Sequence, residues 1–312
     1  MTTEQTAPER RPTLVRKAAG YFAAATLSLY LALKIYWVVA GLLGSGIPGA
    51  TTAADWILLN AVTVGMAALG VGIALALAQD WGRRLPGWAV VFVSWTAAGF
   101  LVSILPAHAV RALLPDKGDP GDIVAAIPEW EMVLVAIAFI GMGIGIAIAG
   151  PLYLRERWPH AFTGRVRDHG PLRTPAAAGI PLALATAATV LYWTLGGGLW
   201  RDDLYNGADP GTATLFATEA AWAVTAAVCA LILLRGRART PVWLPMALLW
   251  IGSGSLFTWN SWRLFIGTAF APDSDGLSRH LPAILAETCG AVAGALLFAT
   301  ALAVHRARSR LL

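Results

Sequence analysis

Eight long apolar stretches constrain the fold of this chain more than any other feature of its sequence. Each holds about 20 predominantly apolar residues, the length that a helix needs to cross the hydrocarbon core of a bilayer. The stretches cover residues 19–43, 56–79, 87–108, 130–153, 177–199, 212–234, 243–266 and 281–304. The sequence therefore predicts an all-α polytopic protein of the cell membrane with eight transmembrane helices. A content of 57% hydrophobic and only 13% charged residues agrees with this class.

The charged residues between the stretches predict the orientation of the helices. Arginine and lysine lie before the first stretch, in every second connection and after the last stretch: Arg10, Arg11, Arg16, Lys17, Arg83, Arg84, Arg155, Arg157, Arg165, Arg167, Arg173, Arg235, Arg237, Arg239, Arg306, Arg308 and Arg310. The other connections are acidic, with Asp116, Asp119, Asp122, Asp202, Asp203, Asp209, Asp273 and Asp275. Because basic loops stay in the cytoplasm, both termini are predicted to be cytoplasmic. Membrane headgroups explain the net charge of +5, so no nucleic-acid partner is predicted.

Motifs that carry catalysis or bind cofactors do not occur in the sequence. The chain has no phosphate-binding glycine loop, no H-E-x-x-H motif and no nucleophile elbow. Cys229 and Cys289 form no C-x-x-C pair, which disfavours a thiol–disulfide oxidoreductase. We therefore predict no cofactor and no metal site, and the sequence leans against an enzyme. The glycine run at 141–145 is typical of close helix packing.

Two halves of the chain share a pattern of aromatic, glycine and acidic residues. Shifts of 156 and 155 residues match Tyr36-Trp37 with Tyr192-Trp193, Gly41 with Gly197, Glu131 with Glu287, Trp95 with Trp250, and Gly99 with Gly254. The pattern predicts two four-helix repeats, residues 1–158 with a basic N-terminal tail and residues 159–312 with a basic C-terminal tail. Because each repeat has an even number of helices, the two insert in parallel about an axis along the membrane normal.

The form Tyr-Trp-x-Leu-Gly-Gly at 192–197, and its relaxed version at 36–41, resemble the first-helix signature of an uncharacterised bacterial family of small four-helix membrane proteins. The resemblance implies that this chain is two such units fused. It supplies no catalytic residues. The first half departs from the signature at Ala40, where the second half has Gly196.

Ionisable side chains inside the apolar stretches are the main functional candidates. A charge at the centre of a spanning helix costs at least about 2.5–3.5 kcal/mol, so it marks a functional site by default. The candidates are Lys34, Glu131, Glu219, Arg263 and Glu287. A rise of about 1.5 Å per residue places all five in the outer half of the bilayer. Trp37 shares a helix face with Lys34, so we add it to the candidate ligand-binding residues.

This shared level predicts an outward-facing polar pocket lined by charges and aromatic side chains. Such a pocket suits a small anionic or amphipathic ligand that the protein binds or transports, with Lys34 and Arg263 meeting the anion.

Two other hypotheses fit the same residues. In the first, the protein is an intramembrane enzyme that acts on a lipid-like substrate, with Glu219 or Glu287 as a general acid or base. In the second, it is a structural or accessory subunit in which Lys34 pairs with Glu219 or Glu287 to hold the bundle together. Glu131 can also be an interfacial carboxylate that the N-terminus of its helix stabilises.

Overall fold

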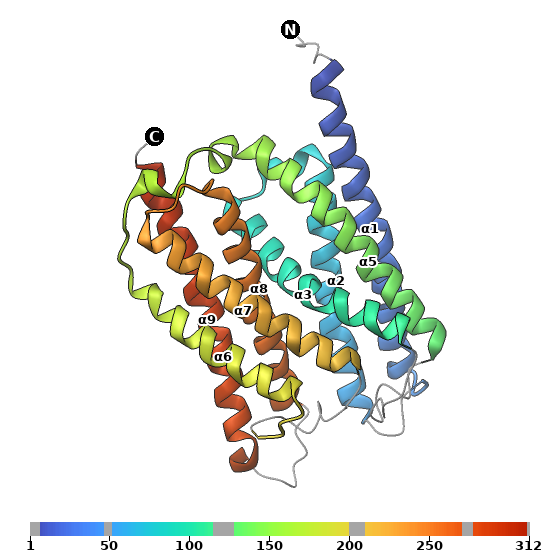
Figure 1. Ribbon diagram of the computed structural model, residues 1–312. Helices are drawn as coiled ribbons and strands as arrows, with labels where there is room; N and C mark the ends of the chain where they lie inside the picture. The colour runs from blue at the N-terminus through green and yellow to red at the C-terminus, as the bar shows by residue number, and fades with distance from the viewer. Residues whose placement is uncertain (1–6, 47–51, 115–127, 200–209, 270–276, 311–312) are drawn as a thin grey trace. The chain divides into compact units, whose positions relative to one another are not determined.

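The computed structural model describes residues 7–46, 52–114, 128–199, 210–269 and 277–310. Within these ranges the chain is all-α, as predicted. Its helices are α1 (Ala7–Leu42), α2 (Ala53–Ala78), α3 (Gly87–Leu113), α5 (Glu129–Arg157), α6 (Gly179–Thr194), α7 (Pro210–Arg235), α8 (Trp243–Ala269) and α9 (Leu277–Ser309) (Figure 1). Each helix overlaps one apolar stretch of the sequence. The acidic residues predicted for the other connections lie outside the described residues.

Seven of these eight helices are long and apolar enough to cross a bilayer, so the chain is a multi-pass membrane protein. The exception is α8, which has a comparable length of 27 residues. It lacks a stretch as long and apolar as those of the other seven, and it carries buried Ser253, Ser255, Thr258, Asn260 and Arg263. A helix enclosed by other helices presents little surface to lipid, so its polar side chains can bind neighbouring helices instead.

The chain divides into two compact units. The first comprises residues 1–94 and 122–159, which include α1, α2, α5 and the first two turns of α3. The second comprises residues 95–121 and 160–312, which include the rest of α3 and α6 to α9. The predicted two-repeat organisation assigns all of α3 to the first half, and the repeat itself stays a prediction.

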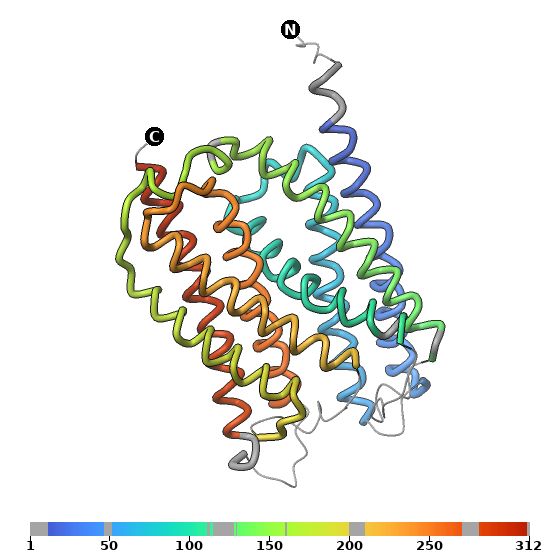
Figure 2. Tube along the Cα trace, in the orientation of Figure 1, coloured from blue at the N-terminus to red at the C-terminus, as the bar shows by residue number. Residues whose placement is uncertain are grey.

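In the first unit, α1 packs along both α2 and α5 (Figures 1 and 2). Small residues make these contacts close. A Cβ atom added to Gly145 would lie 2.6 Å from the carbonyl oxygen of Ala19, and one added to Gly141 would lie 2.5 Å from the Thr26 side chain. The prediction that the 141–145 glycine run serves helix packing is therefore confirmed at these two positions.

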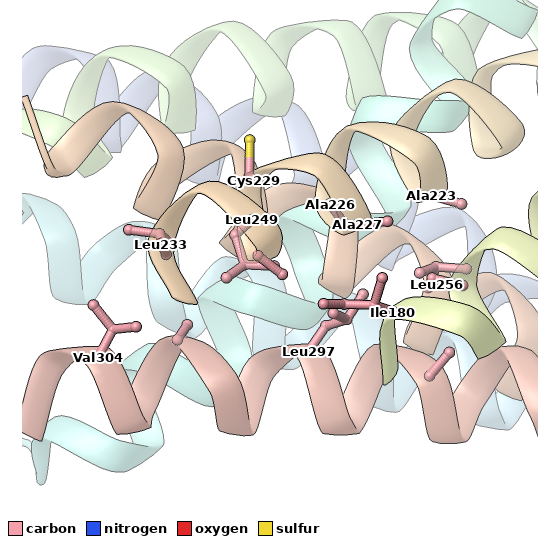
Figure 3. Packing of buried hydrophobic residues seen from close by; sticks show 14 of the residues in the cluster. Ile180, Ala223, Ala226, Ala227, Cys229, Leu233, Leu249, Leu256, Leu297 and Val304 are labelled. Carbon is pink, nitrogen blue, oxygen red and sulfur yellow. The ribbon is translucent and has the colours of Figure 1, made fainter. Parts of the chain in front are cut away.

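The second unit has an alanine-rich core between α6, α7, α8 and α9 (Figure 3). Figure 3 shows part of this core, with Leu233 of α7, Leu249 of α8 and Leu297 of α9. Close contacts hold α8 on three sides. Gly252 lies against the Trp222 carbonyl of α7, Gly254 against Gly99 of α3, and Gly294 of α9 against the Phe257 backbone.

The ends of α1 and α6 explain why the two Tyr-Trp segments differ. Each helix ends in a Schellman turn whose glycine has a positive φ, +73° at Gly44 and +89° at Gly196. Gly196 follows Tyr192 by four residues, so α6 stops before the predicted end at residue 199. In the first half Ala40 stands at the matching position. Because alanine disfavours positive φ, α1 continues for about one more turn.

Basic residues gather at one end of the first unit. Arg16 is buried and lies 3.1 Å from Glu156, which also accepts a 2.6 Å bond from Arg83. Lys17 lies 3.8 Å from Asp80. These pairs bring together the start of α1, the α2–α3 connection and the end of α5. The start of α1 therefore lies beside the end of α2 and the end of α5, as it does when neighbouring helices run antiparallel.

The glycine contacts generate a stability prediction. We expect Gly145→Ala to destabilise the protein by about 1–3 kcal/mol, because the added methyl group overpacks the α1–α5 contact. The matched control is Gly150→Ala on the same helix, where a Cβ would meet nothing within 4 Å. Unfolding in mixed micelles measures both variants. Equal stability of the two variants would contradict the assignment of Gly145 to a close helix contact.

Candidate functional site

The first unit contains an ion pair between Lys34 of α1 and Glu131 of α5. The Lys34 Nζ atom lies 3.5 Å from Oε1 of Glu131. The second carboxylate oxygen, Oε2, accepts a 3.0 Å hydrogen bond from the Trp37 indole N–H. Glu131 lies in the first turn of α5 and is only 2% exposed, so the positive end of the helix dipole also favours its charge.

Aromatic rings surround this ion pair. The Lys34 ammonium lies 5.4 Å from the centre of the Tyr30 ring, and Tyr30 packs against Phe139 of α5. The Trp37 ring meets the Trp56 ring of α2 edge to face at 5.6 Å. The predicted shared face of Lys34 and Trp37 is therefore formed, and Tyr30 and α5 complete it.

Trp56 contributes an unusual polar group beside this cluster. Its side chain is 6% exposed, and its indole N–H has no hydrogen-bond partner among the residues that the structure describes. A buried donor without a partner costs about 1–3 kcal/mol, so such a group calls for an explanation. A ligand with an acceptor group would provide one.

The second unit contains a three-residue charge cluster centred on Arg263 of α8. Its Nη1 atom donates to Glu219 of α7 at 2.8 Å, and its Nε atom donates to Glu287 of α9 at 2.8 Å. The Arg263 side chain is 2% exposed, and the two carboxylate side chains are 4% and 8% exposed. The guanidinium also lies 5.7 Å from the Phe216 ring.

The two clusters differ in how firmly they hold their cation. Charge-assisted bonds of about 2.7–2.9 Å are the strong ones, and Arg263 makes two of them. Lys34 makes one ionic contact of 3.5 Å, and its side chain is 14% exposed. Arg263 therefore joins three helices through two short bonds, whereas one longer ionic contact holds Lys34.

The structure brings the six predicted site residues together in two groups, one in each unit. Lys34, Trp37 and Glu131 form the first group, and Glu219, Arg263 and Glu287 form the second. The pairing of Lys34 with Glu219 or Glu287 is wrong, because Glu131 is the partner of Lys34 and both other carboxylates bind Arg263.

Sequence reasoning identified the charged members of the site and missed one aromatic member. Trp56 was not among the candidates, because a tryptophan near the end of an apolar stretch is typical of the membrane interface. The available signal was Asn60, one turn later, whose side chain binds the Trp56 carbonyl at 2.8 Å and marks a polar helix face.

The matched carboxylates of the predicted repeats bind cations from different helices. Glu131 binds Lys34, whereas Glu287, its counterpart, binds Arg263 from the third helix of its half. Val190 stands at the position that matches Lys34, and His108 at the one that matches Arg263.

Comparisons of the chain with protein-family models, curated proteins and solved structures give no match. The resemblance to the family with the Tyr-Trp-x-Leu-Gly-Gly signature stays a prediction. Among the residues that the structure describes, no group of three or more histidine, cysteine, aspartate or glutamate side chains is placed to hold a metal ion.

The difference between the two cations predicts different costs of removing them. We expect Arg263→Met to destabilise the protein by about 3–5 kcal/mol, because two buried carboxylates lose their cation. Lys34→Met should destabilise the protein less. Its carboxylate partner, Glu131, still accepts the Trp37 hydrogen bond and still lies at the positive N-terminal end of α5. Unfolding in mixed micelles measures both. A Lys34→Met variant as unstable as Arg263→Met would contradict this distinction between the two cations. Adding Glu219→Gln and Glu287→Gln to Arg263→Met should restore part of the lost stability, because the two carboxylate charges are then removed as well.

Proposed function

We propose that the protein binds or transports a small anionic or amphipathic ligand at a site centred on Lys34. The observation that carries this proposal is the looseness of the Lys34–Glu131 pair, at 3.5 Å and with a partly exposed lysine. A membrane protein gains little stability from such a pair after the cost of desolvating two charges. An anion that takes the place of Glu131 would give the lysine at this position a function.

The surroundings of Lys34 define the chemistry of the ligand. The ammonium offers three donors to an anion, and the Trp56 N–H adds a further donor in the same cluster. The Tyr30, Trp37 and Trp56 rings suit an apolar tail next to the anionic group. A carboxylate or phosphate with a short alkyl chain combines these features.

The Arg263 cluster supports a structural role for the second unit. Its guanidinium joins α7, α8 and α9 through two 2.8 Å bonds that are almost completely buried. We assign this cluster to holding the helices in place, so that the two charge clusters serve different purposes. This division combines the ligand-binding hypothesis with the structural one.

The same proposal includes the topology of the chain. All eight helices cross the membrane, with both termini in the cytoplasm and Lys34 in the outer half. Polar side chains of α8 that bind neighbouring helices support its crossing of the membrane. The basic side chains that gather at one end of the first unit support a cytoplasmic location of that end. The two parallel repeats, residues 1–158 and 159–312, are part of this proposal, and the matched glycines Gly99 and Gly254 both serve close helix contacts.

Binding of simple amphiphiles tests the Lys34 site. In nanodiscs, we expect the wild type to bind octanoate or octyl phosphate, and octyltrimethylammonium not to bind. Lys34→Met should weaken binding about tenfold or more, because it removes a charged hydrogen-bond donor. Isothermal titration calorimetry measures the affinities, and uptake into proteoliposomes tests transport.

The matched control is Lys17→Met, which removes a lysine from the other end of α1, where it lies near Asp80. This variant should bind the anionic amphiphiles as the wild type does. Equal binding by wild type and Lys34→Met, with both folded by circular dichroism, would overturn the proposal.

Reporter fusions test the topology and the crossing of α8. Alkaline phosphatase fused after Gly236 should be inactive, because this connection is cytoplasmic, and a fusion after Asp273 should be active. Activity of the first fusion, or inactivity of the second, would show that α8 does not cross in the proposed direction.

A further inference from the structure

One end of the second unit forms an ordered surface of three segments. The connection after α5 lies along the α7–α8 connection, where Val166 N donates to Thr240 O at 3.1 Å and Arg167 N donates to Ala238 O at 3.0 Å. The Arg308 side chain of α9 donates to the carbonyl of Thr163. These bonds join residues 160–173, residues 235–242 and the end of α9 into one surface.

This surface is strongly basic. Its arginines are Arg165, Arg167, Arg173, Arg235, Arg237, Arg239, Arg306, Arg308 and Arg310, and all except the half-buried Arg308 are exposed. Asp168 is the one acidic residue in the three segments. The described part of this surface contains an ion pair between Arg167 and Asp168, whose side-chain atoms lie 4.0 Å apart.

At the basic end of the first unit, in contrast, basic side chains bind other groups of the same unit. There Glu156 binds both Arg16 and Arg83, and Arg157 donates to the carbonyls of Gly82 and Leu85. These cations stabilise the fold of their own unit. In the second unit, Arg237 and Arg239 make no such bond to the described residues.

Helix ends account for only some of the arginines in the second unit. Arg235, Arg306 and Arg308 lie in the last turns of α7 and α9, where the helix dipole favours a cation. Arg237 and Arg239 lie in the α7–α8 connection and have no such role. Their positions directly after a membrane-spanning helix place them at the level of lipid headgroups.

We infer that this surface of the second unit binds the phosphate group of an anionic phospholipid. A guanidinium presents a planar pair of donors that matches the two free oxygens of a phosphodiester. The hydrogen bonds between the segments hold the arginines together before the lipid arrives, which reduces the entropy lost on binding. This site is independent of Lys34, and either can fail without the other.

Lipid titration of the full-length protein tests the inference. The detergent-purified protein is titrated with dioleoylphosphatidylglycerol or dioleoylphosphatidylcholine, and bound lipid is counted by native mass spectrometry. Phosphatidylglycerol should be retained and phosphatidylcholine should not. Arg237→Gln with Arg239→Gln should weaken phosphatidylglycerol binding about tenfold or more, since each basic residue contributes to attraction at an anionic surface.

The matched control is Arg84→Gln with Arg155→Gln, which removes two exposed arginines from the basic end of the first unit. This variant should retain phosphatidylglycerol as the wild type does. An equal loss in both double variants would mean non-specific attraction and would overturn the inference. Equal retention of phosphatidylglycerol and phosphatidylcholine would also overturn the inference. Binding of a polyglutamate peptide that phosphatidylglycerol cannot displace would overturn it as well.

Discussion

The cost of placing charge inside a membrane is the constraint on which this structure depends. Every charged side chain that lies deep in a helix must find a partner, and the partners decide how the helices pack. Arg263 satisfies this constraint with two carboxylates from two other helices. Lys34 satisfies it with one longer ionic contact to Glu131. The same physical requirement thus produces a junction of three helices in one unit and a longer ion pair between two helices in the other.

Close backbone contacts make these ion pairs possible. In lipid, apolar side chains gain little from meeting one another, so association relies on tight packing of small residues. Gly145 against Ala19 holds α1 to α5, and Gly294 against Phe257 holds α9 to α8. The carboxylates of Glu131 and Glu287 reach their cations because these helices already lie close together.

The helices could be predicted from the sequence because a spanning helix needs a long apolar stretch, whatever its neighbours are. The charged site residues could be predicted for the same reason, since Lys34 and Arg263 interrupt such stretches. Their pairing could not, because the partner of a side chain depends on which helices are neighbours. Trp56 shows the same limit, since its unsatisfied N–H follows from its packing against Trp37 and α1.

The most direct test of the proposed site is an experimental structure of the protein in nanodiscs with octyl phosphate. Our account predicts phosphate density within hydrogen-bond distance of Lys34 Nζ and Trp56 Nε1, with the Glu131 carboxylate displaced from Lys34. Density for the phosphate elsewhere in the protein, while Lys34 stays paired with Glu131, would contradict it.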